Sequence, residues 1–368
     1  MSFMSSKKSW ICGVVAVALS AGAFIFYNHR SVTVSSILGT ENLSETLLEE
    51  LYMSSVFQRL KKIDQSGPAH YFRKVDFFSR FSHSLGVFAL LRRHNCSLLE
   101  QAAGLMHDVS HTAFSHLGDY IFSSNAQEAA KSNHQDRIHL HYLQKQNIDR
   151  ILAKYNFKIN ELDPDSGHYL ALEQPLPDLC ADRIEYILHT ALVTKMLTKN
   201  EVQSIFDDLH FDGKHWFFTQ SELARRFANL SLYYTKEFWG APWNARMNIH
   251  FAEIIKRCFA LGVLTHDDLF LTDQEVLDKI MAYQNEKHDR LIKLYWDQCE
   301  KIDEDFSDIK YNMVKIQPKF RGVDPLIMTK DGLVRLTAID SDYNQKFTEI
   351  RQWCKNGFEI KVIVPPDL

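Results

Sequence analysis

Residues 103–116 read AGLMHDVSHTAFSH, and the rest of the prediction is built outward from this stretch. Its first residues are small and apolar, so His107 and Asp108 are expected to end a buried helix. Ionisable groups at a buried helix end need a partner or a metal ion. A His-Asp pair alone also occurs by chance as a solvated helix end, so the surrounding residues must decide between the two interpretations.

Further residues that commonly bind metals lie on other predicted helices. His83 lies in the run Arg80–Val87 (RFSHSLGV), and Asp182 lies on a helix predicted over residues 178–196. A helical bundle can direct such side chains at one ion. Imidazoles combined with carboxylates favour one divalent transition metal, such as Mn, Fe or Zn, over Ca, with Mg as the alternative. Such a metal lowers the pKa of bound water and produces a nucleophile at neutral pH.

The spacing of hydrophobic residues predicts a mainly α-helical domain over residues 45–302. Helices are expected over residues 79–93, 97–107, 133–154, 178–196 and 244–261. The pattern changes after Asp303, where strands over 311–316, 333–337 and 359–364 and a helix over 342–355 are expected. Residues 303–368 are therefore predicted to form a small α+β module.

The first 30 residues carry a membrane signal. Lys7 and Lys8 precede an uncharged run from Trp10 to Tyr27, which is at the lower length limit for spanning a bilayer. Either this is an uncleaved signal anchor or it is a signal peptide with Ala21-Gly22-Ala23 as the cleavage site. The apolar run continues past that site, which favours the anchor. We expect a protein anchored in a membrane or exported, with residues 31–44 as a polar linker; the side of the membrane stays open.

Charge and cysteine content exclude some classes of protein. The formal net charge of −4 does not suggest a protein that coats nucleic acid, so no stable nucleic-acid partner is expected. The six cysteines form no CxxC pair and are expected to be buried free thiols, so a structural zinc site is not indicated.

Together, the ordered motifs resemble HD-domain metal-dependent phosphohydrolases, in the branch of bacterial dGTPases and the SAM- and HD-domain dNTP triphosphohydrolase. The resemblance covers about residues 45–365, and Val323-Asp324-Pro325 is similar to bacterial members. The segments that carry it follow in the same order with similar gaps: residues 57–65 (FQRLKKIDQ), 80–87, 103–116, His134-Gln135 and 178–186 (DLCADRIEY).

The resemblance implies a role for each matched residue. The implied metal ligands are His83, His107, Asp108 and Asp182. The implied catalytic residues are His111, His134 as proton donor to the leaving oxygen, and Asp119, which would orient one of these histidines. The implied substrate-binding residues are Arg80 and His116, with Arg80 gripping phosphate, and Gln65 and Tyr186 on the sugar side.

The chain departs from the family pattern at three places. Gln135 stands where the family usually has Glu, and a neutral amide cannot raise the pKa of a neighbouring histidine as a carboxylate does. Either Asp136 substitutes for that carboxylate or the proton donor is weakened. Thr112-Ala113 replaces a Gly-Pro pair, and residues 70–78 differ from the family's approach to Arg80. Base and sugar selectivity are therefore open.

The leading hypothesis is an active phosphohydrolase that cleaves a phosphate ester or anhydride of a nucleotide-like substrate. One alternative is a protein that binds metal and nucleotide but turns over poorly, with Gln135 as its signature. Another is a membrane-tethered scaffold in which the histidines merely pack. The expected partners are a nucleotide or another phosphorylated small molecule, a membrane through the N-terminal segment and, from the resemblance, a second copy of the chain in a homo-oligomer.

Outside these motifs lie a group of aromatic side chains and a group of basic side chains. Phe217, Phe218, Trp239 and Trp243 are expected in the core rather than as a platform on which a base stacks. The basic cluster Arg59, Lys61, Lys62, Arg73 and Lys74 either attracts a polyphosphate or forms a solvated face.

Overall fold

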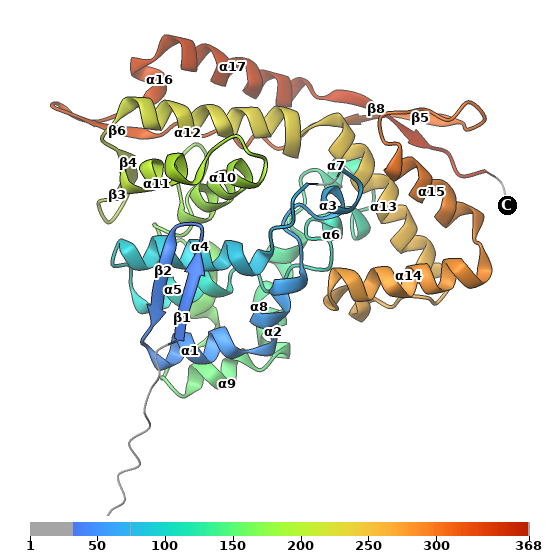
Figure 1. Cartoon of the computed structure of the whole chain (residues 1–368), viewed down its shortest axis with the longest axis horizontal. Helices are drawn as coiled ribbons and strands as arrows, with labels where there is room; N and C mark the ends of the chain where they lie inside the picture. The colour runs from blue at the N-terminus through green and yellow to red at the C-terminus, as the bar shows by residue number, and fades with distance from the viewer. Residues whose placement is uncertain (1–31, 74, 367–368) are drawn as a thin grey trace, which may run out of the picture. The chain divides into compact units, whose positions relative to one another are not determined.

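Helices α4 (Arg80–Arg93) and α5 (Leu98–Met106) pack side by side, and α10 (Ala181–Val193) packs against α4 (Figure 1). The structure is a computed structural model that describes residues 32–73 and 75–366. Helices α4 and α5 both begin at a serine whose hydroxyl accepts a backbone N–H of the first turn, Ser79 for α4 and Ser97 for α5. They agree with the helices predicted over 79–93 and 97–107.

The first half of the chain contains further helices. Those before α10 are mostly short: α1 (Thr46–Met53), α2 (Ser55–Arg59), η1 (Leu60–Lys62), α3 (Pro68–Arg73), α6 (Leu117–Ile121), α7 (Ala126–Ala129), α8 (His134–Lys145), α9 (Ile148–Ala153), η2 (Ile159–Leu162) and η3 (Pro164–Ser166). The helix predicted over 133–154 is thus two helices, because Asn147 adopts the left-handed conformation (φ 59°) and interrupts it.

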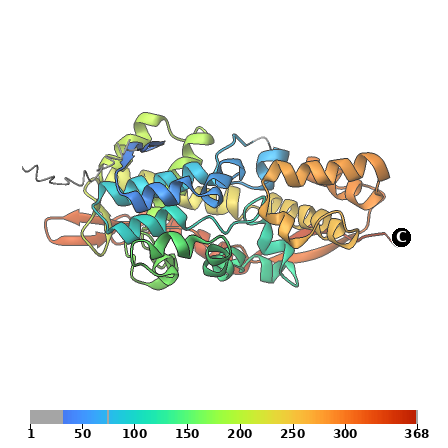
Figure 2. The same ribbon diagram turned by 90° about the horizontal axis from the view of Figure 1, so that it is seen from below.

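Longer helices dominate the second half. They are α11 (Lys199–Asp207), α12 (Ser221–Tyr234), α13 (Pro242–Ala260), α14 (Asp273–Lys287), α15 (Arg290–Glu300) and α17 (Ser341–Asn356). Shorter elements of this half are the helix α16 (Leu336–Ile339), the π-helical turn η4 (Thr235–Trp239) and the 3-10 turn η5 (His266–Phe270). Seen from below in Figure 2, α14 and α15 (orange) lie beside α13 (yellow), and α13 and α15 are in direct contact.

Three small sheets accompany the helices. β1 (Val32–Ser36) and β2 (Gly39–Leu43) form an antiparallel hairpin where a polar linker was predicted. β5 (Tyr311–Ile316) pairs antiparallel with β8 (Phe358–Ile363), and both agree with strands predicted over 311–316 and 359–364. The third sheet has the order β3-β4-β6-β7 and joins distant parts of the chain: β3 (Leu209–Phe211), β4 (Trp216–Phe218), β6 (Leu326–Thr329) and β7 (Gly332–Arg335).

The C-terminal residues pack directly on the helices. β4 and β6 are parallel neighbours, with Phe217 opposite Leu326, so strands from both sides of residue 303 share one sheet. α17 packs against α12, and β8 packs against α13 (Figure 1). Residues Val32–Leu368 form one compact unit. The C-terminal segment can therefore contribute side chains to a site built by the helices.

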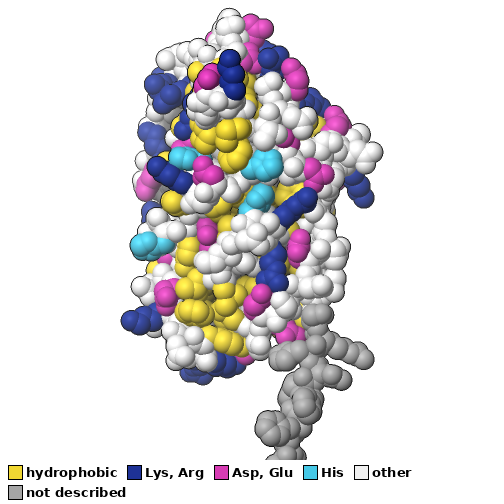
Figure 3. All heavy atoms as spheres, turned by 90° about the vertical axis from the view of Figure 1, so that its left-hand side faces the viewer, with side chains coloured by type: hydrophobic (Ala, Val, Ile, Leu, Met, Phe, Trp, Pro, Cys, Tyr) yellow, Lys and Arg dark blue, Asp and Glu magenta, His cyan; other side chains and the backbone are white. Residues whose placement is uncertain are grey.

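Two hydrophobic cores flank the loop that follows α5. The first core includes side chains of β1, α1, α4, α5, α10 and α12, and the second includes side chains of α6, α13, α14 and α15. The loop leaves the first core at Val109 and enters the second at Ala113. Residues 107–116 are thus held between two packed regions. The face shown in Figure 3 carries hydrophobic, histidine, basic and acidic side chains interspersed.

The membrane part of the predicted fold and the predicted membrane localisation are corrected here. The apolar run that suggested them, residues 10–27, lies outside the described residues. Among the described residues, no helix combines the length and the apolar character needed to cross a bilayer. The observed fold is mostly helical with small sheets. The prediction of buried free thiols is confirmed for Cys180, Cys258, Cys299 and Cys354; Cys96 is free but only partly buried, and Cys12 is not described.

Candidate metal centre

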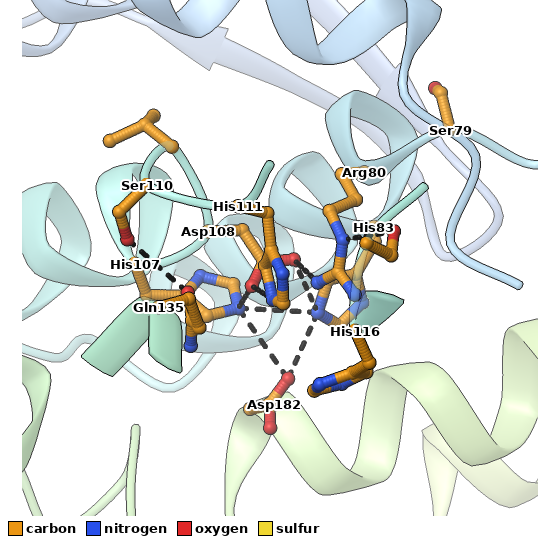
Figure 4. Close-up of polar contacts among 12 residues, drawn as sticks. Ser79, Arg80, His83, His107, Asp108, Ser110, His111, His116, Gln135 and Asp182 are labelled. Carbon is orange, nitrogen blue, oxygen red and sulfur yellow. Dashed lines mark hydrogen bonds and ion pairs between the residues drawn. The ribbon is translucent and has the colours of Figure 1, made fainter. Parts of the chain in front are cut away.

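Four side chains predicted as metal ligands converge on one point (Figure 4). His83 comes from α4, His107 and Asp108 from the end of α5, and Asp182 from the first turn of α10. The Nε2 atom of His83 lies 3.2 Å from Nε2 of His107 and 2.9 Å from Oδ1 of Asp182. Nε2 of His107 lies 3.5 Å from the nearer Asp108 oxygen and 3.5 Å from Oδ1 of Asp182.

The other ring nitrogens set the protonation of both imidazoles. Nδ1 of His83 donates to the buried carboxylate of Glu185, and Nδ1 of His107 donates to the Gly104 carbonyl oxygen at 2.7 Å. With the proton on Nδ1, each neutral imidazole directs a lone pair from Nε2 at the same point. Two lone pairs facing each other beside a carboxylate repel one another unless a cation lies between them. The donor set therefore fits a metal ion.

The spacing of the donors also fits one ion. Two donor atoms about 2.1 Å from a shared ion are roughly 3.0 Å apart at a right angle and roughly 3.4 Å apart at a tetrahedral angle. The observed separations of His83 from its neighbours, 2.9, 3.2 and 3.6 Å, span this range. His83, His107 and Asp108 are buried, which excludes a merely solvated cluster.

The electrostatics of the site point the same way. Burial alone would lower the pKa of His83, but Glu185 and Asp182 raise it to about 10, so without a metal ion this ring also holds a proton on Nε2, which a metal ion would displace to bind the neutral ring. Burial raises the pKa of Asp182, yet His107 and His83 hold it well below its usual range. The pKa of Asp108 is likewise low despite burial, because Arg80 and His107 lie beside it. The site thus keeps its carboxylates ionised and attracts positive charge.

Glu185 is a functional residue to which the sequence analysis gave no role. One of its oxygens accepts from His83, and the other accepts from Nδ1 of His189 at 2.7 Å. Its approach to α4 requires Gly86, because a β-carbon at Gly86 would lie 2.8 Å from the Glu185 carboxyl carbon. A signal for it was present in the sequence: Glu185 is one helical turn after Asp182, so both side chains point to the same face of α10.

Arg80, predicted to grip phosphate, lies beside the four ligands. Its Nη1 donates to Asp108 at 2.6 Å, and its Nε donates to the Ser115 hydroxyl at 2.7 Å. Its Nη2 is buried and has no hydrogen-bond partner among the described residues. A buried donor without a partner is costly, so this nitrogen is suited to receive an oxygen of a ligand.

Three histidines predicted beside the substrate have different surroundings. His111 is buried 3.3 Å from Asp108, and burial together with Arg80 lowers its pKa to about 3. The half-exposed His116 lies next to it, with ring centres 4.9 Å apart. His134 begins α8 and stacks on Phe122, with ring centres 4.2 Å apart. Among the described residues, the His134 ring makes no hydrogen bond, and no ion pair of it is found.

Asp119 was expected to orient His111 or His134, and the structure gives it a different side-chain partner. Its Oδ2 is 3.2 Å from Nδ1 of His116, whereas its Oδ1 accepts the backbone N–H of His134 at 2.6 Å. Asp119 therefore pairs with the imidazole of His116 and with only the backbone of His134. Gln135 accepts from Ser110 at 3.3 Å and donates to Asp136, so neither residue is bonded to the His134 ring.

Comparison with known proteins identifies the family. Residues 80–188 match the model described as HD domain. The uncharacterized protein YdhJ of Bacillus subtilis is 31% identical over 332 residues, which cover 90% of this chain and 99% of that protein. The chain belongs to the HD-domain family.

Further relatives of this HD-domain protein are similar in sequence or in fold. The metal-dependent phosphohydrolase cns2 of Cordyceps militaris is 29% identical over 280 residues, covering 72% of this chain and 78% of that protein. A crystal structure of a phosphohydrolase from Bacteroides thetaiotaomicron has a TM-score of 0.64 at 15% identity and covers 90% of this chain and 98% of that one. A hypothetical protein from Aquifex aeolicus has a TM-score of 0.59 at 15% identity, over 88% and 99% of the two chains. The two structures show the fold, and the family with the related phosphohydrolase supports a hydrolase.

The HD-domain protein carries a buried clasp outside the matched segment. Asp273 in α14 accepts the backbone N–H of Asp64 at 2.9 Å, that of Phe114 at 2.7 Å and the hydroxyl of Tyr71 at 3.2 Å. Arg59, one of the predicted basic cluster, donates inward to the carbonyl oxygens of His111 and Leu271 and is not a surface charge. The bonds to Asp273 thus connect two segments to α14: the one with Asp64, which precedes Arg80 in the chain, and the one with Phe114, which follows α5.

A cavity opens at Ser115 and His116, which follow the predicted metal ligands His107 and Asp108 in the chain. Its walls include the predicted residues Gln65, His116, Asp119 and Tyr186. The cavity is open to solvent, and its volume is about 150 Å³. Trp239, expected in the core, also lines it and meets Tyr186 edge to face with ring centres 5.1 Å apart. Oε1 of Gln65 is buried without a hydrogen-bond partner among the described residues.

Proposed function

We propose that this HD-domain protein is a metal-dependent phosphohydrolase that cleaves a phosphate ester or anhydride of a nucleotide-like substrate. The observation that carries the proposal is the convergence of His83, His107 and Asp182 beside the unpaired Nη2 of Arg80. The donor set suits Mn, Fe or Zn, with Mg as the alternative. When bound, such a divalent metal activates water and neutralises charge on a phosphate.

Arg80 is proposed to hold the reacting phosphate. Two of its three nitrogens are held by Asp108 and Ser115, which fixes the guanidinium plane. The third nitrogen, Nη2, has no hydrogen-bond acceptor among the described residues and is left to donate to a phosphate oxygen. Because phosphoryl transfer depends mainly on positioning and on charge neutralisation, a preoriented guanidinium beside the metal ligands serves both needs.

His116 is proposed to deliver the proton to the leaving oxygen. Its Nδ1 is paired with Asp119, and its side chain is 46% exposed at the cavity. A carboxylate on Nδ1 leaves Nε2 free for substrate and opposes the lowering of the His116 pKa by desolvation, Arg80 and Arg321. The role implied for His134 by the family resemblance remains the competing proposal, since His134 lines a small cavity together with His111 and His116. His111 has a strongly lowered pKa, which suits a neutral ring that positions the phosphate.

The walls of the cavity support a nucleotide-like substrate. Tyr186 and Trp239 offer aromatic surface for a base or a sugar, and Gln65 offers an unpaired acceptor for a hydroxyl group. Trp239 ends the π-helical turn η4, a geometry that often marks functional sites. A substrate like that of the dNTP triphosphohydrolases is therefore the finer proposal. Assembly into a homo-oligomer stays a prediction from the resemblance.

A second candidate function is a catalytically weak sensor that binds metal and nucleotide. It is favoured by Gln135, which bonds to Ser110 and Asp136 and supplies no carboxylate to a histidine. The two functions predict the same metal content and differ in turnover.

The test uses the full-length chain. Metal content is measured by elemental analysis, and nucleoside mono-, di- and triphosphates are then supplied with Mn, Fe or Mg while released phosphate, pyrophosphate and triphosphate are quantified. Asp182→Ala is expected to lose metal and turnover together, whereas the exposed Asp331→Ala is the matched control and should keep both. Metal near one ion per chain without turnover would favour the sensor, and absence of metal binding would overturn the proposal.

A further inference from the structure

A short segment outside the matched HD-domain residues reaches the cavity. Residues 317–322, here called the arm, follow β5, and Pro318, Lys319 and Arg321 line the cavity wall. The arm leads directly into Val323-Asp324-Pro325, the motif that the sequence analysis singled out without giving it a function. The family match ends at residue 188, so it does not include this wall.

The arm is held at both ends. Before it, Ile316 pairs with Phe358 in the β5–β8 ladder. After it, the backbone N–H of Val323 donates to Ser231 at 3.1 Å, and that of Asp324 donates to the Pro177 carbonyl oxygen at 2.9 Å. Gly322 has no room for a side chain, because an added β-carbon would lie 2.6 Å from Leu232. The arm is thus a positioned part of the cavity wall.

Lys319 and Arg321 bring two positive charges to the cavity, where Asp119 and Asp136 are near Lys319 but form no ion pair with it within the described residues. Lys319 donates to the Ser132 carbonyl oxygen at 2.7 Å and to the Asn133 side-chain oxygen, both neutral acceptors. Arg321 lies over the Tyr186 ring, 6.0 Å from its centre. Neither forms an ion pair within the described residues. Burial and the neighbouring Arg321 lower the pKa of Lys319 to about 8, so an anion at this place would relieve a real electrostatic cost.

Lys319 and Arg321 line the same cavity as His116, the proposed proton donor. Arg80 and Arg321 both act on His116, whose pKa is lowered first by desolvation and further by these two guanidinium groups, against the opposing effect of Asp119. Arg80 contacts the ligand Asp108, whereas Arg321 contacts Tyr186 on the cavity wall. His116 is therefore within electrostatic reach of two separate basic groups, one at the metal ligands and one on the arm.

We propose that Lys319 and Arg321 form a second anion-binding pair, which holds a phosphate group of the substrate other than the one hydrolysed beside the metal ligands. This inference rests on the proposed function in that it uses the same cavity. It makes the arm, and with it the segment after residue 303, part of the active site. It also assigns the substrate a second phosphate within the span of the cavity.

A purely structural role for Lys319 is the main competing explanation, because Lys319 also holds the loop that precedes His134. Arg321 separates the two explanations, since it contacts the Tyr186 ring and not that loop. A structural role would also be met by neutral hydrogen-bond donors. An anion-binding role requires positive charge at both positions and weakens with salt.

The test measures the binding of inorganic pyrophosphate to the full-length, metal-loaded chain by titration calorimetry at two salt concentrations. Lys319→Met and Arg321→Met are each expected to weaken binding by about tenfold, the effect of losing one charge-assisted hydrogen bond. Arg321→Lys should retain most of the affinity. Lys315→Met, in the neighbouring strand β5 and exposed, is the matched control and should bind as wild type does. Metal content, measured for every variant, should stay unchanged.

The outcomes separate this inference from the proposed function. Wild-type affinity in both methionine variants would overturn the anion-binding pair, even if the chain hydrolyses nucleotides. Failure of the wild-type chain to bind pyrophosphate would overturn it as well. Charge-dependent binding of pyrophosphate in a chain that hydrolyses no phosphate compound would support the pair and refute the proposed hydrolase.

Discussion

Gly86 of α4 and Glu185 of α10 are in such close contact that a β-carbon at position 86 would overlap the Glu185 side chain. This contact lets the Glu185 carboxylate reach Nδ1 of His83. Glu185, which orients the proposed metal ligand His83, can therefore take this position only because Gly86, one helical turn after His83, has no side chain. A helix-interior glycine costs roughly 0.5–1 kcal/mol relative to alanine, which the arrangement must offset.

Gly86→Ala is expected to weaken metal binding by about 10- to 100-fold, the usual effect of disturbing a partner of a ligating histidine. Overlap with Glu185 should also lower the free energy of unfolding by about 1–3 kcal/mol, in spite of the better helix propensity of alanine. Metal titration and thermal unfolding measure the two effects. The double variant Gly86→Ala/Glu185→Gln serves as the control, because its loss of metal affinity should be less than the sum of the single losses. Unchanged metal affinity in Gly86→Ala would refute this role of the glycine.

His116→Ala is expected to lower kcat by about 10²–10⁴-fold while leaving metal content unchanged, because it removes the proposed proton donor. Asp119→Asn should share much of the defect, since Asp119 is the side-chain partner of His116. His134→Ala should cost less than about tenfold, because its ring stacks on Phe122 and lacks a carboxylate partner. The exposed His141→Ala is the control. A large loss in His134→Ala with little loss in His116→Ala would restore the assignment implied by the family resemblance.

Gln135→Glu is expected to change kcat by less than about threefold, well below the usual contribution of an acid–base group. Gln135 is bonded to Ser110 and Asp136, so a carboxylate there would meet Asp136 rather than a histidine. Burial and the nearby Asp165 raise the pKa of Asp136 to about 6, so a further carboxylate is unfavourable there. Steady-state kinetics of Gln135→Glu beside Gln144→Glu on the same helix provide the comparison. A strong acceleration confined to Gln135→Glu would show that the missing carboxylate limits the enzyme.

The clasp predicts a dependence of stability on pH. Burial and the neighbouring Asp273 raise the pKa of Asp64 to about 7, above its value in the unfolded chain. The folded state therefore binds the proton more tightly, and the contribution of Asp64 to stability falls as pH rises from about 4 to about 7. Relative to wild type, Asp64→Asn should gain stability across this window, as measured by urea unfolding at several pH values. A constant difference between variant and wild type would contradict the raised pKa.

Helices α4 and α5 and the metal ligands could be predicted because their signals are local. α4 and α5 follow hydrophobic spacing and begin at capping serines, and the four ligands belong to short motifs. The four-stranded sheet could not be predicted from the sequence. Its strands β3, β4 and β7 have only three or four residues, and β4 pairs with β6, which lies more than a hundred positions further along the chain.

The surroundings of the site were harder to predict than its ligands. The pairing of Asp119 with His116 depends on where the five-residue helix α6 begins. Lys319 and Arg321 carry no periodic signal, since they lie in a segment without regular structure. Trp239 looked like a core residue by composition, and the π-helical turn that brings it to the cavity has no recognisable sequence pattern.

The clasp centred on Asp273 has a consequence for how a ligand enters. Its carboxylate holds the backbone of the segment that carries Gln65 and of the loop that carries Ser115, while Tyr71 closes the third side. Swinging the segment with Gln65 outward would break the bonds from Asp64 and Tyr71, and swinging the loop with Ser115 outward would break the bond from Phe114; either movement would leave the buried Asp273 carboxylate with fewer partners. The clasp therefore favours entry of a ligand through the existing mouth of the cavity over entry by outward movement of these two segments.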